Sequence, residues 1–184
     1  MLRYSILLFA FSLFSITAYN QNGAFDLGVE FQAYPTGLIP GIHLELGISE
    51  KDAIQGRVGY NIVRHRDLGV QDDETGGGFG FTLGYRRYFK PQRSGIFIGA
   101  RSDLWFNEVD WIANIDSPDE IRGTSNVTVL QPTAELGYVV HIGEKGVFFS
   151  PNIALGAEIN INTDGAEIGQ GAILLLGFSF GKRF

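Results

Sequence analysis

The 184-residue sequence contains no cysteine and a single methionine, and acidic residues outnumber basic ones. A lipoprotein needs a cysteine to carry its lipid, so that class is excluded together with any disulfide framework. Beyond the first twenty residues, no apolar run approaches the roughly 20 residues that a membrane-spanning helix needs. The formal net charge of −6 argues against nucleic acid as a partner. These absences leave a soluble domain or a membrane protein built of strands.

The first residues have the pattern of a cleavable signal peptide. Arg3 supplies a positive start, a short apolar run covers residues 5–18, and polar Asn20 follows closely. The run is too short for a convincing spanning helix, and an uncleaved anchor is the alternative. We therefore predict a signal peptide at residues 1–18 and one mature domain at residues 19–184.

Apolar residues alternate with small or polar residues at the end of the chain. Leu174, Phe178 and Phe184 share one face, whereas Ser179 and Arg183 share the other. This period of two is that of a strand with one apolar side. The pattern recurs in eight segments, each about as long as the 9–11 residues of a tilted membrane strand. The segments are 25–34, 41–48, 53–64, 78–89, 96–107, 126–140, 147–161 and 172–184. We predict an all-β fold, a closed antiparallel eight-stranded up-and-down transmembrane β-barrel.

The connections between these segments alternate in length. Short charged turns are expected at 49–52, 90–95 and 141–146, and longer loops at 65–77, 108–125 and 162–171. The first connection, 35–40, is the short exception, in which two prolines stop the ladder. Small outer-membrane barrels combine short periplasmic turns with longer outer loops. We therefore predict a bacterial outer-membrane location with both termini in the periplasm.

Aromatic residues fall near the ends of the predicted strands. Two groups are expected to form girdles at the two membrane interfaces, although aromatics also simply favour strands. The turn-side group is Phe89, Phe97, Tyr138, Phe148, Phe149 and Phe184, and the loop-side group is Tyr34, Tyr60, Phe79, Trp105, Phe106 and Trp111.

Charged residues of both signs occupy the polar phase of the strands. If the apolar faces meet lipid, these side chains point into a lumen that is only wide enough for side chains to fill. Buried charges must pair, because breaking one buried pair costs roughly 3–5 kcal/mol. We therefore predict a structural ion-pair network that plugs the lumen, with a proton or ion path as the alternative. Its members are Glu30, Glu45, Arg57, Arg86, Arg101, Asp103, Glu135 and Glu158.

With this strand count, loop asymmetry, charged lumen and terminal Phe184, the chain resembles the small eight-stranded outer-membrane proteins of the OmpA/OmpX type. The resemblance covers essentially the whole mature chain and rests on no sequence motif, so it implies an architecture and no activity. It includes no periplasmic peptidoglycan-binding domain. The rival fold is a soluble lipocalin-like carrier, in which the aliphatic set would face inward and the charged set would face water.

Candidates for chemistry are few. His65 with Asp67 is the best catalytic candidate, but no nucleophile motif accompanies it, and Ser102 has no identifiable partner. The acidic clusters at 67–74 and 110–120 match no calcium-binding pattern and are interpreted as solvated charges. We therefore predict a protein that is not an enzyme and that has no cofactor and no metal.

The predicted role is structural or interactive, as a stand-alone surface barrel or an accessory subunit of a larger outer-membrane complex. Expected partners are outer-membrane lipid, lipopolysaccharide and other outer-membrane proteins. Trp111, Ile112 and Ile115 form a candidate apolar contact in the longest predicted loop. The alternatives are an outer-membrane lipid-modifying enzyme, a narrow pore and the lipocalin-like carrier.

Overall fold

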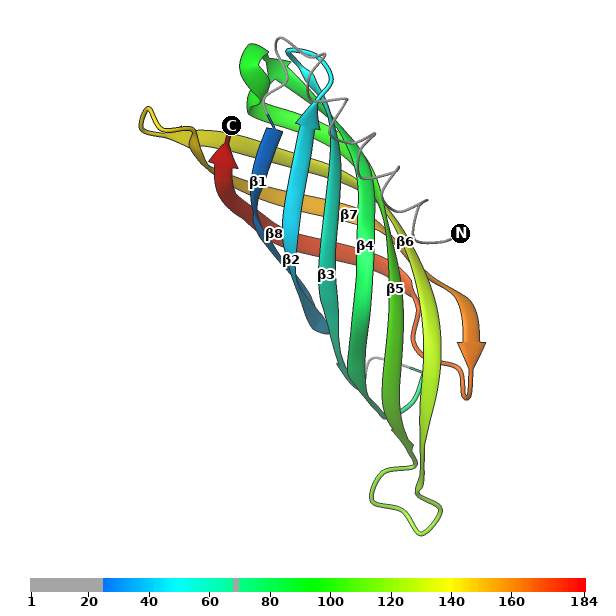
Figure 1. The fold of residues 1–184 in the computed structure, drawn as a ribbon. Helices are drawn as coiled ribbons and strands as arrows, with labels where there is room; N and C mark the ends of the chain where they lie inside the picture. Colours follow the sequence, from blue (N-terminus) through cyan, green and yellow to red (C-terminus); the bar gives the residue numbers. More distant parts are fainter. Residues whose placement is uncertain (1–24, 68–69) are drawn as a thin grey trace, which may run out of the picture.

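The computed structural model describes residues 25–67 and 70–184, so the predicted signal peptide at 1–18 lies outside the described residues. Within these ranges, eight antiparallel strands close into a barrel in chain order (Figure 1). The elements are β1 (Phe25–Tyr34), β2 (Gly37–Gly47), β3 (Asp52–Arg66), β4 (Asp73–Lys90), the short 3-10 helix η1 (Pro91–Arg93), β5 (Ser94–Ala113), β6 (Ile121–Ile142), β7 (Val147–Asp164) and β8 (Gly171–Arg183). The predicted closed up-and-down β-barrel fold is confirmed.

Closure comes from the pairing of the first and last strands. Val29 of β1 lies opposite Phe180 of β8, and Ala33 lies opposite Leu176. The two chain ends of the barrel therefore meet, and the rings of Phe25 and Phe184 stack with centroids 4.9 Å apart. Within the described ranges, no helix is both long and apolar enough to cross a membrane.

The two ends of the barrel differ in their connections. We call the end that carries both strand termini and residues 48–51, 91–93 and 143–146 the turn end. The opposite end, which carries residues 35–36, 67, 70–72, 114–120 and 165–170, is called the loop end.

Two of the predicted long loops are mostly strand. β5 continues to Ala113 and β6 begins at Ile121, so the predicted loop 108–125 shrinks to residues 114–120. In the same way, the predicted loop 65–77 shrinks to residues 67–72. The sequence prediction ended each strand where its outward face ceased to be apolar. A backbone ladder does not require apolar side chains, and it continues with polar ones.

The predicted break at 35–40 is also wrong. Only Pro35 and Thr36 connect β1 to β2, and Pro40 lies inside β2. Proline has no N–H to donate, so it is tolerated in a sheet only where the ladder lacks a bond. The β2–β3 ladder is interrupted between Leu38 and Gly41, which is where Pro40 sits.

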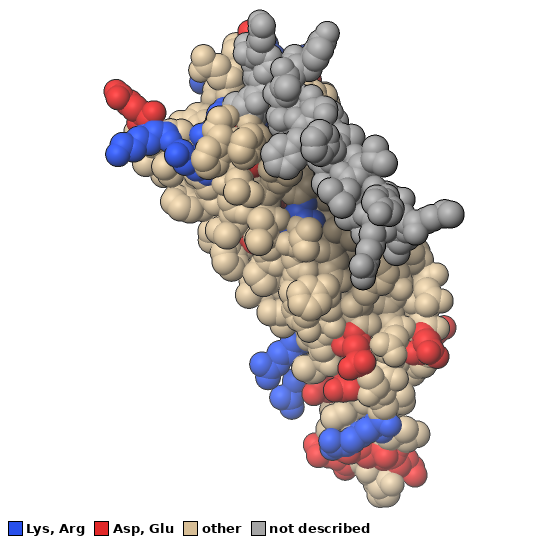
Figure 2. All heavy atoms as spheres, in the orientation of Figure 1, with Lys and Arg blue, Asp and Glu red and all other residues tan. Residues whose placement is uncertain are grey.

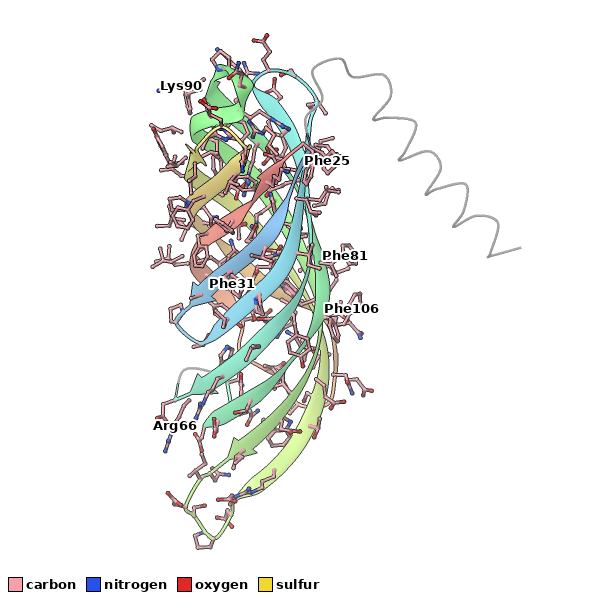
Figure 3. All side chains as sticks on the ribbon, turned by 60° about the vertical axis from the view of Figure 1, so that its left-hand side comes forward. Phe25, Phe31, Arg66, Phe81, Lys90 and Phe106 are labelled. Carbon is pink, nitrogen blue, oxygen red and sulfur yellow. The ribbon has the colours of Figure 1, made fainter. Side chains whose placement is uncertain are left out.

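The apolar phase of the strands lies outside the barrel and the charged phase lies inside it. Phe79 and Leu83 are 70% and 65% exposed, whereas Arg86 is 2% and Glu45 is 1% exposed. On the face drawn in Figure 2, charged residues gather mainly at the two ends, and the middle is mostly uncharged. In Figure 3, Phe31, Phe81 and Phe106 lie along the wall between Lys90 and Arg66. This arrangement contradicts the lipocalin-like alternative, which needs an apolar interior.

Two apolar clusters fill the lumen on either side of its charged middle. The cluster near the turn end contains Ala53, Tyr88, Phe97, Val139 and Phe148. The cluster near the loop end contains Tyr34, Ile39, Trp105, Val109, Val127, Val129, Ala154, Ile168, Ile173 and Leu175. The predicted girdles therefore need correction, because Tyr34, Phe97, Trp105 and Phe148 are buried inside the barrel. Each of these four residues occupies a position whose side chain points inward in the alternation along its strand. That alternation predicts the side of the wall better than closeness to a strand end does.

Small residues make room for the large inward rings. A Cβ atom on Gly137 would collide with the ring of Phe97, and one on Gly80 would collide with Trp105. Large and small inward residues on adjacent strands thus fill a narrow, tapering interior. This pairing explains why several of the chain's glycines fall at inward positions of the sheet.

Candidate functional site in the lumen and at its loop end

The middle of the lumen is a charged layer centred on Glu30. Arg101 Nη1 and Arg57 Nη1 lie 2.8 and 2.9 Å from Glu30 Oε1, and His43 Nδ1 lies 3.1 Å from its other oxygen. Arg57 also donates to Asp103 through Nη2 over 2.9 Å. These side chains are at most 1% exposed, so cations and anions must compensate each other directly.

A second charged layer lies nearer the turn end and is centred on Arg86. Its Nε and Nη2 donate to the two oxygens of Glu135 over 2.7 and 3.1 Å, which is a bidentate pair. Its Nη1 donates to Glu45 over 3.1 Å, and the Tyr88 hydroxyl donates to the same carboxylate. The guanidinium also lies 4.4 Å from the centre of the Phe97 ring.

Sequence reasoning left several members out of this network. At the turn end, Arg183 Nη2 donates to Asp26 over 2.6 Å, and Arg93 Nη2 lies 3.4 Å from the same carboxylate. Asp26 shares the strand parity of Glu30, so its position was predictable. Arg93 belongs to η1 at the turn, where no alternation applies. The other polar side chains omitted from the predicted network are Gln32, His43, Gln55, Thr82 and Tyr88.

Seven of the eight residues in the predicted network lie in these two layers, but Glu158 does not. It lies toward the loop end, where it helps to line a cavity. Its Oε2 accepts a hydrogen bond from Gln131 Nε2 over 3.3 Å. Within the described ranges, no Lys or Arg lies at ion-pair distance from Glu158.

Glu74 joins three segments of the loop end. Its carboxylate lies 2.7 Å from His65 Nδ1 and accepts hydrogen bonds from the backbone N–H groups of Val70 and Gln71 over 2.9 and 3.0 Å. It also accepts one from Gly169 N over 3.2 Å. Glu74 is fully buried, although sequence reasoning treated it as a solvated loop acid. It holds the 165–170 connection over the lumen.

The catalytic candidate is not assembled. The imidazole of His65 pairs with Glu74 and not with Asp67. His65 is buried on the inward side of β3, whereas Ser102 is exposed on the outward side of β5. A nucleophile must lie within hydrogen-bond reach of its base, so these two cannot act together.

The acidic residues of the 114–120 connection are used in local contacts. Arg122 Nε donates to Glu120 Oε1 over 2.7 Å, and this hydrogen bond lowers the pKa of Glu120 below its ordinary value. Asp72 accepts a hydrogen bond from Ile115 N over 3.1 Å, which ties two connections together. Among the described residues, no group of three or more His, Asp or Glu side chains is arranged to hold a metal ion.

The three residues of the predicted loop contact lie in two elements. Trp111 and Ile112 lie in β5 and are half-buried, and Ile115 lies in the 114–120 connection. The Trp111 ring packs against Gly123, and its Nε1 donates to Ser125 Oγ over 3.1 Å. Ile112 follows Trp111 directly in the strand and so points to the other side.

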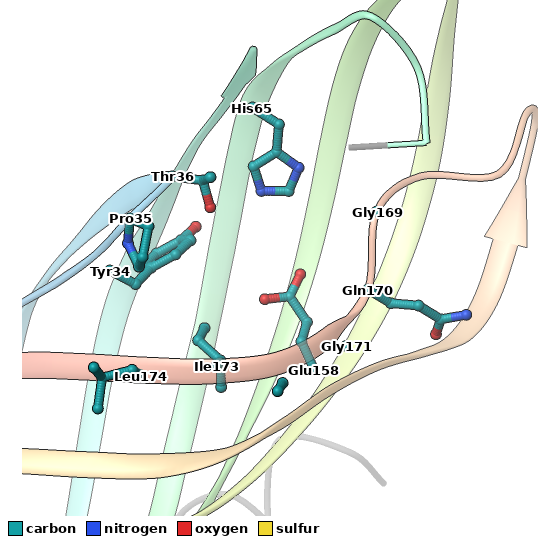
Figure 4. A pocket seen from close by; sticks show the side chains of 11 residues that line it. Tyr34, Pro35, Thr36, His65, Glu158, Gly169, Gln170, Gly171, Ile173 and Leu174 are labelled. Atoms are coloured by element: carbon teal, nitrogen blue, oxygen red, sulfur yellow. The ribbon is translucent and has the colours of Figure 1, made fainter. Parts of the chain in front are cut away.

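A cavity of about 250 Å³ opens at the loop end, beside Glu158 (Figure 4). The β1–β2 connection forms one wall through Tyr34, Pro35 and Thr36. Residues 169–174 form another, and His65 and Glu158 face each other across the space. Ile173 at its base belongs to the apolar cluster that fills the lumen beneath.

No protein-family model matches the sequence, and no curated protein matches it either. Among solved structures, the chain is similar to the N-terminal β-barrel domain of Pseudomonas aeruginosa OprF, with 15% identity and a TM-score of 0.47 over 88% of this chain and 99% of that one. It is also similar to Neisserial surface protein A, with 10% identity and a TM-score of 0.46 over 87% of this chain and 97% of that one. The eight-stranded architecture implied by the OmpA/OmpX resemblance is present in the described barrel itself.

Proposed function

We propose that this protein is an integral outer-membrane barrel with a closed lumen and both termini in the periplasm. Its role would be that of a structural or interaction component, and not that of an enzyme. The observation that carries the proposal is the inverted arrangement of faces, with apolar side chains exposed around the wall and charged pairs buried within it. Such a wall is stable in lipid because the closed ladder leaves no unpaired backbone edge there. The turn end, with its short connections, would face the periplasm.

A closed lumen follows from the packing of the charged middle layer. The side chains of Glu30 and Arg101 are both 0% exposed, so no water-sized space adjoins them. A pore needs a wetted wall along its whole length. In planar bilayers, the purified protein is therefore expected to give no conductance above the lipid baseline, with a known porin as the positive control. Reproducible single-channel steps that scale with the amount of inserted protein would contradict this expectation.

The interaction role is supported by the part of the wall that continues past the apolar belt. We call this part the extension, and it consists of residues 63–66, 73–78, 107–113 and 121–127. Figure 1 shows β5 and β6 reaching furthest at this end. One row across its outward face is polar and exposed, and it consists of Arg64, Thr75, Asp110 and Thr124. The extension would thus stand in water beyond the membrane.

The β6 side edge of the extension offers unpaired backbone. The β2–β3 ladder starts at the pair Gly37–Val63, and the β6–β7 ladder starts at Asn126–Asp164. On β3, the next N–H, that of Arg64, already donates to Thr36 O over 2.7 Å, whereas residues 121–125 of β6 have no strand partner on one side within the described ranges. Such edges accept an added strand from another protein through main-chain hydrogen bonds.

A photo-crosslinking experiment tests this role in whole cells. A benzophenone amino acid would replace Arg64 or Thr124 on the extension, with Leu83 of the apolar belt and Glu144 of the turn end as matched positions. Crosslinks to one discrete protein are expected from the extension alone. Identical products at Leu83, or none from either extension position, would contradict the role.

Lipid is the second proposed partner. At the boundary between belt and extension, the wall has a hollow of about 500 Å³ beside the bare backbone of Gly77 and Gly78. The rings of Tyr60, Phe79 and Phe106 border this hollow, and polar Glu108, Asn126 and Asn162 complete it. Aromatic rings beside polar groups suit the interfacial level of a membrane, where lipopolysaccharide head groups would lie. The measurement is the amount of lipopolysaccharide that copurifies with each barrel in mild detergent.

A further inference from the structure

We propose that the cavity at the loop end binds the primary ammonium group of a small aliphatic amine, with Glu158 as the counterion. This inference goes beyond the proposed function, because it concerns a ligand and not the barrel's place in the membrane. It begins from the distribution of charge inside the barrel.

Every other carboxylate of the predicted network faces a guanidinium. Glu30 and Asp103 face Arg57 and Arg101, and Glu45 and Glu135 face Arg86. Glu158 accepts a hydrogen bond from the Gln131 amide, and no Lys or Arg of the described ranges lies at ion-pair distance from it. Burial without a cation disfavours the ionised form and raises the pKa of the Glu158 carboxyl above its ordinary value, so a cation that enters the cavity would stabilise the carboxylate.

His65 does not supply the missing charge. Its Nδ1 already lies 2.7 Å from the buried carboxylate of Glu74. Even with a protonated imidazole, one positive charge would serve two carboxylates, Glu74 and Glu158. An ionised Glu158 would then still leave one negative charge at the cavity.

The cavity lining selects an organic ammonium over a metal ion. Calcium takes about 6–8 oxygen ligands, and Glu158 is the single carboxylate among the described residues that line this cavity. An ammonium has three donors, which a carboxylate, the Thr36 hydroxyl and a backbone carbonyl can satisfy together. The Tyr34 ring adds a face that attracts cations.

The size and the remaining walls indicate a short aliphatic chain. A cavity of about 250 Å³ lies below the roughly 300–1,000 Å³ of pockets for drug-sized ligands. Pro35 and Ile173 supply apolar surface for methylene groups. Gln170 and Gly171 at the rim are exposed, so a solute could enter from the loop end.

Isothermal titration calorimetry of the folded barrel in detergent, at neutral pH and low salt, tests the proposal. The probes are n-butylamine and 1,4-diaminobutane, with 1-butanol as the neutral analogue of similar shape. Saturable binding is expected for the amines and not for the alcohol. Phosphorylethanolamine, as a third probe, distinguishes the ammonium of a lipid head group from a free amine.

Two variants locate the site. Glu158→Gln keeps the shape of the side chain and is expected to weaken amine binding at least tenfold, whereas Glu144→Gln at the exposed turn end should leave binding unchanged. Thr36→Phe leaves Glu158 in place and should abolish binding by filling the cavity. Absence of saturable amine binding to the unmodified protein would overturn the proposal. So would equal affinity in a folded Glu158→Gln or Thr36→Phe variant.

Discussion

Replacing Arg86 with methionine is expected to destabilise the barrel by about 3–5 kcal/mol, the cost of breaking a buried ion pair from one side. The variant would leave Glu135 without its bidentate partner and Glu45 without a hydrogen bond of 3.1 Å. Both carboxylates are almost fully buried, so water cannot replace the guanidinium.

The adjacent residue provides a matched control. Arg87 points outward near the turn end, where its exposed guanidinium donates to Asp52 over 2.6 and 2.7 Å. Exposed pairs contribute little to stability, so Arg87→Met should leave the unfolding curve nearly unchanged. The measurement is urea unfolding in phospholipid vesicles, followed by tryptophan fluorescence and by the gel mobility of the folded form.

A double variant separates lost charge pairing from lost packing. Removing Glu135 together with Arg86, as Arg86→Met with Glu135→Leu, should recover part of the loss, because no carboxylate is then left without its partner. If Arg87→Met were the costlier single change, the assignment of inside and outside would be reversed. Equal effects of both single variants would show that the lumen is hydrated.

Strand parity explains how much of this barrel the sequence could predict. In a strand of period two, one correctly placed residue fixes the side of every neighbour, so the inward positions of Glu30, Arg57 and Arg101 follow from the apolar residues between them. The ends of the strands could not be predicted in this way. The outward residues of the extension are polar, so the sequence there does not show the alternation that marks a membrane strand. The prediction that Pro40 ends a strand was wrong for a related reason. Pro40 lies where the β2–β3 ladder is interrupted, and that position depends on the register between the two strands.

The contacts at the loop end could not be predicted in the same way. Glu74 binds backbone groups of Val70 and Gly169, which come together only when the 67–72 and 165–170 connections fold over the lumen. Glu158 was correctly placed on the inward face, but parity says nothing about depth along the barrel. Its separation from the arginine layers depends on the apolar cluster that contains Trp105 and Ile173, which lies between them.

The second large effect on stability is expected from a substitution of Trp105. Its side chain is fully buried, its ring lies 5.2 Å from Arg57 Cζ, and its Nε1 donates to Gln131 over 3.4 Å. It therefore joins the charged layer to the apolar cluster at the loop end. Trp105→Ala should cost about 3–5 kcal/mol, as expected for a large buried ring replaced by a cavity.

Phe106, the next residue, is the matched control because it is 54% exposed on the outward face. Phe106→Ala removes an exposed ring of the outer wall and is expected to change stability far less than Trp105→Ala. Thermal unfolding followed by circular dichroism suits this pair, since one variant lacks a tryptophan reporter. A larger loss for Phe106→Ala would mean that interfacial anchoring outweighs lumen packing. The expected order instead places the stability of this barrel in its filled interior. In the proposed membrane setting lipid would solvate the outer face, whereas only side chains can fill the lumen.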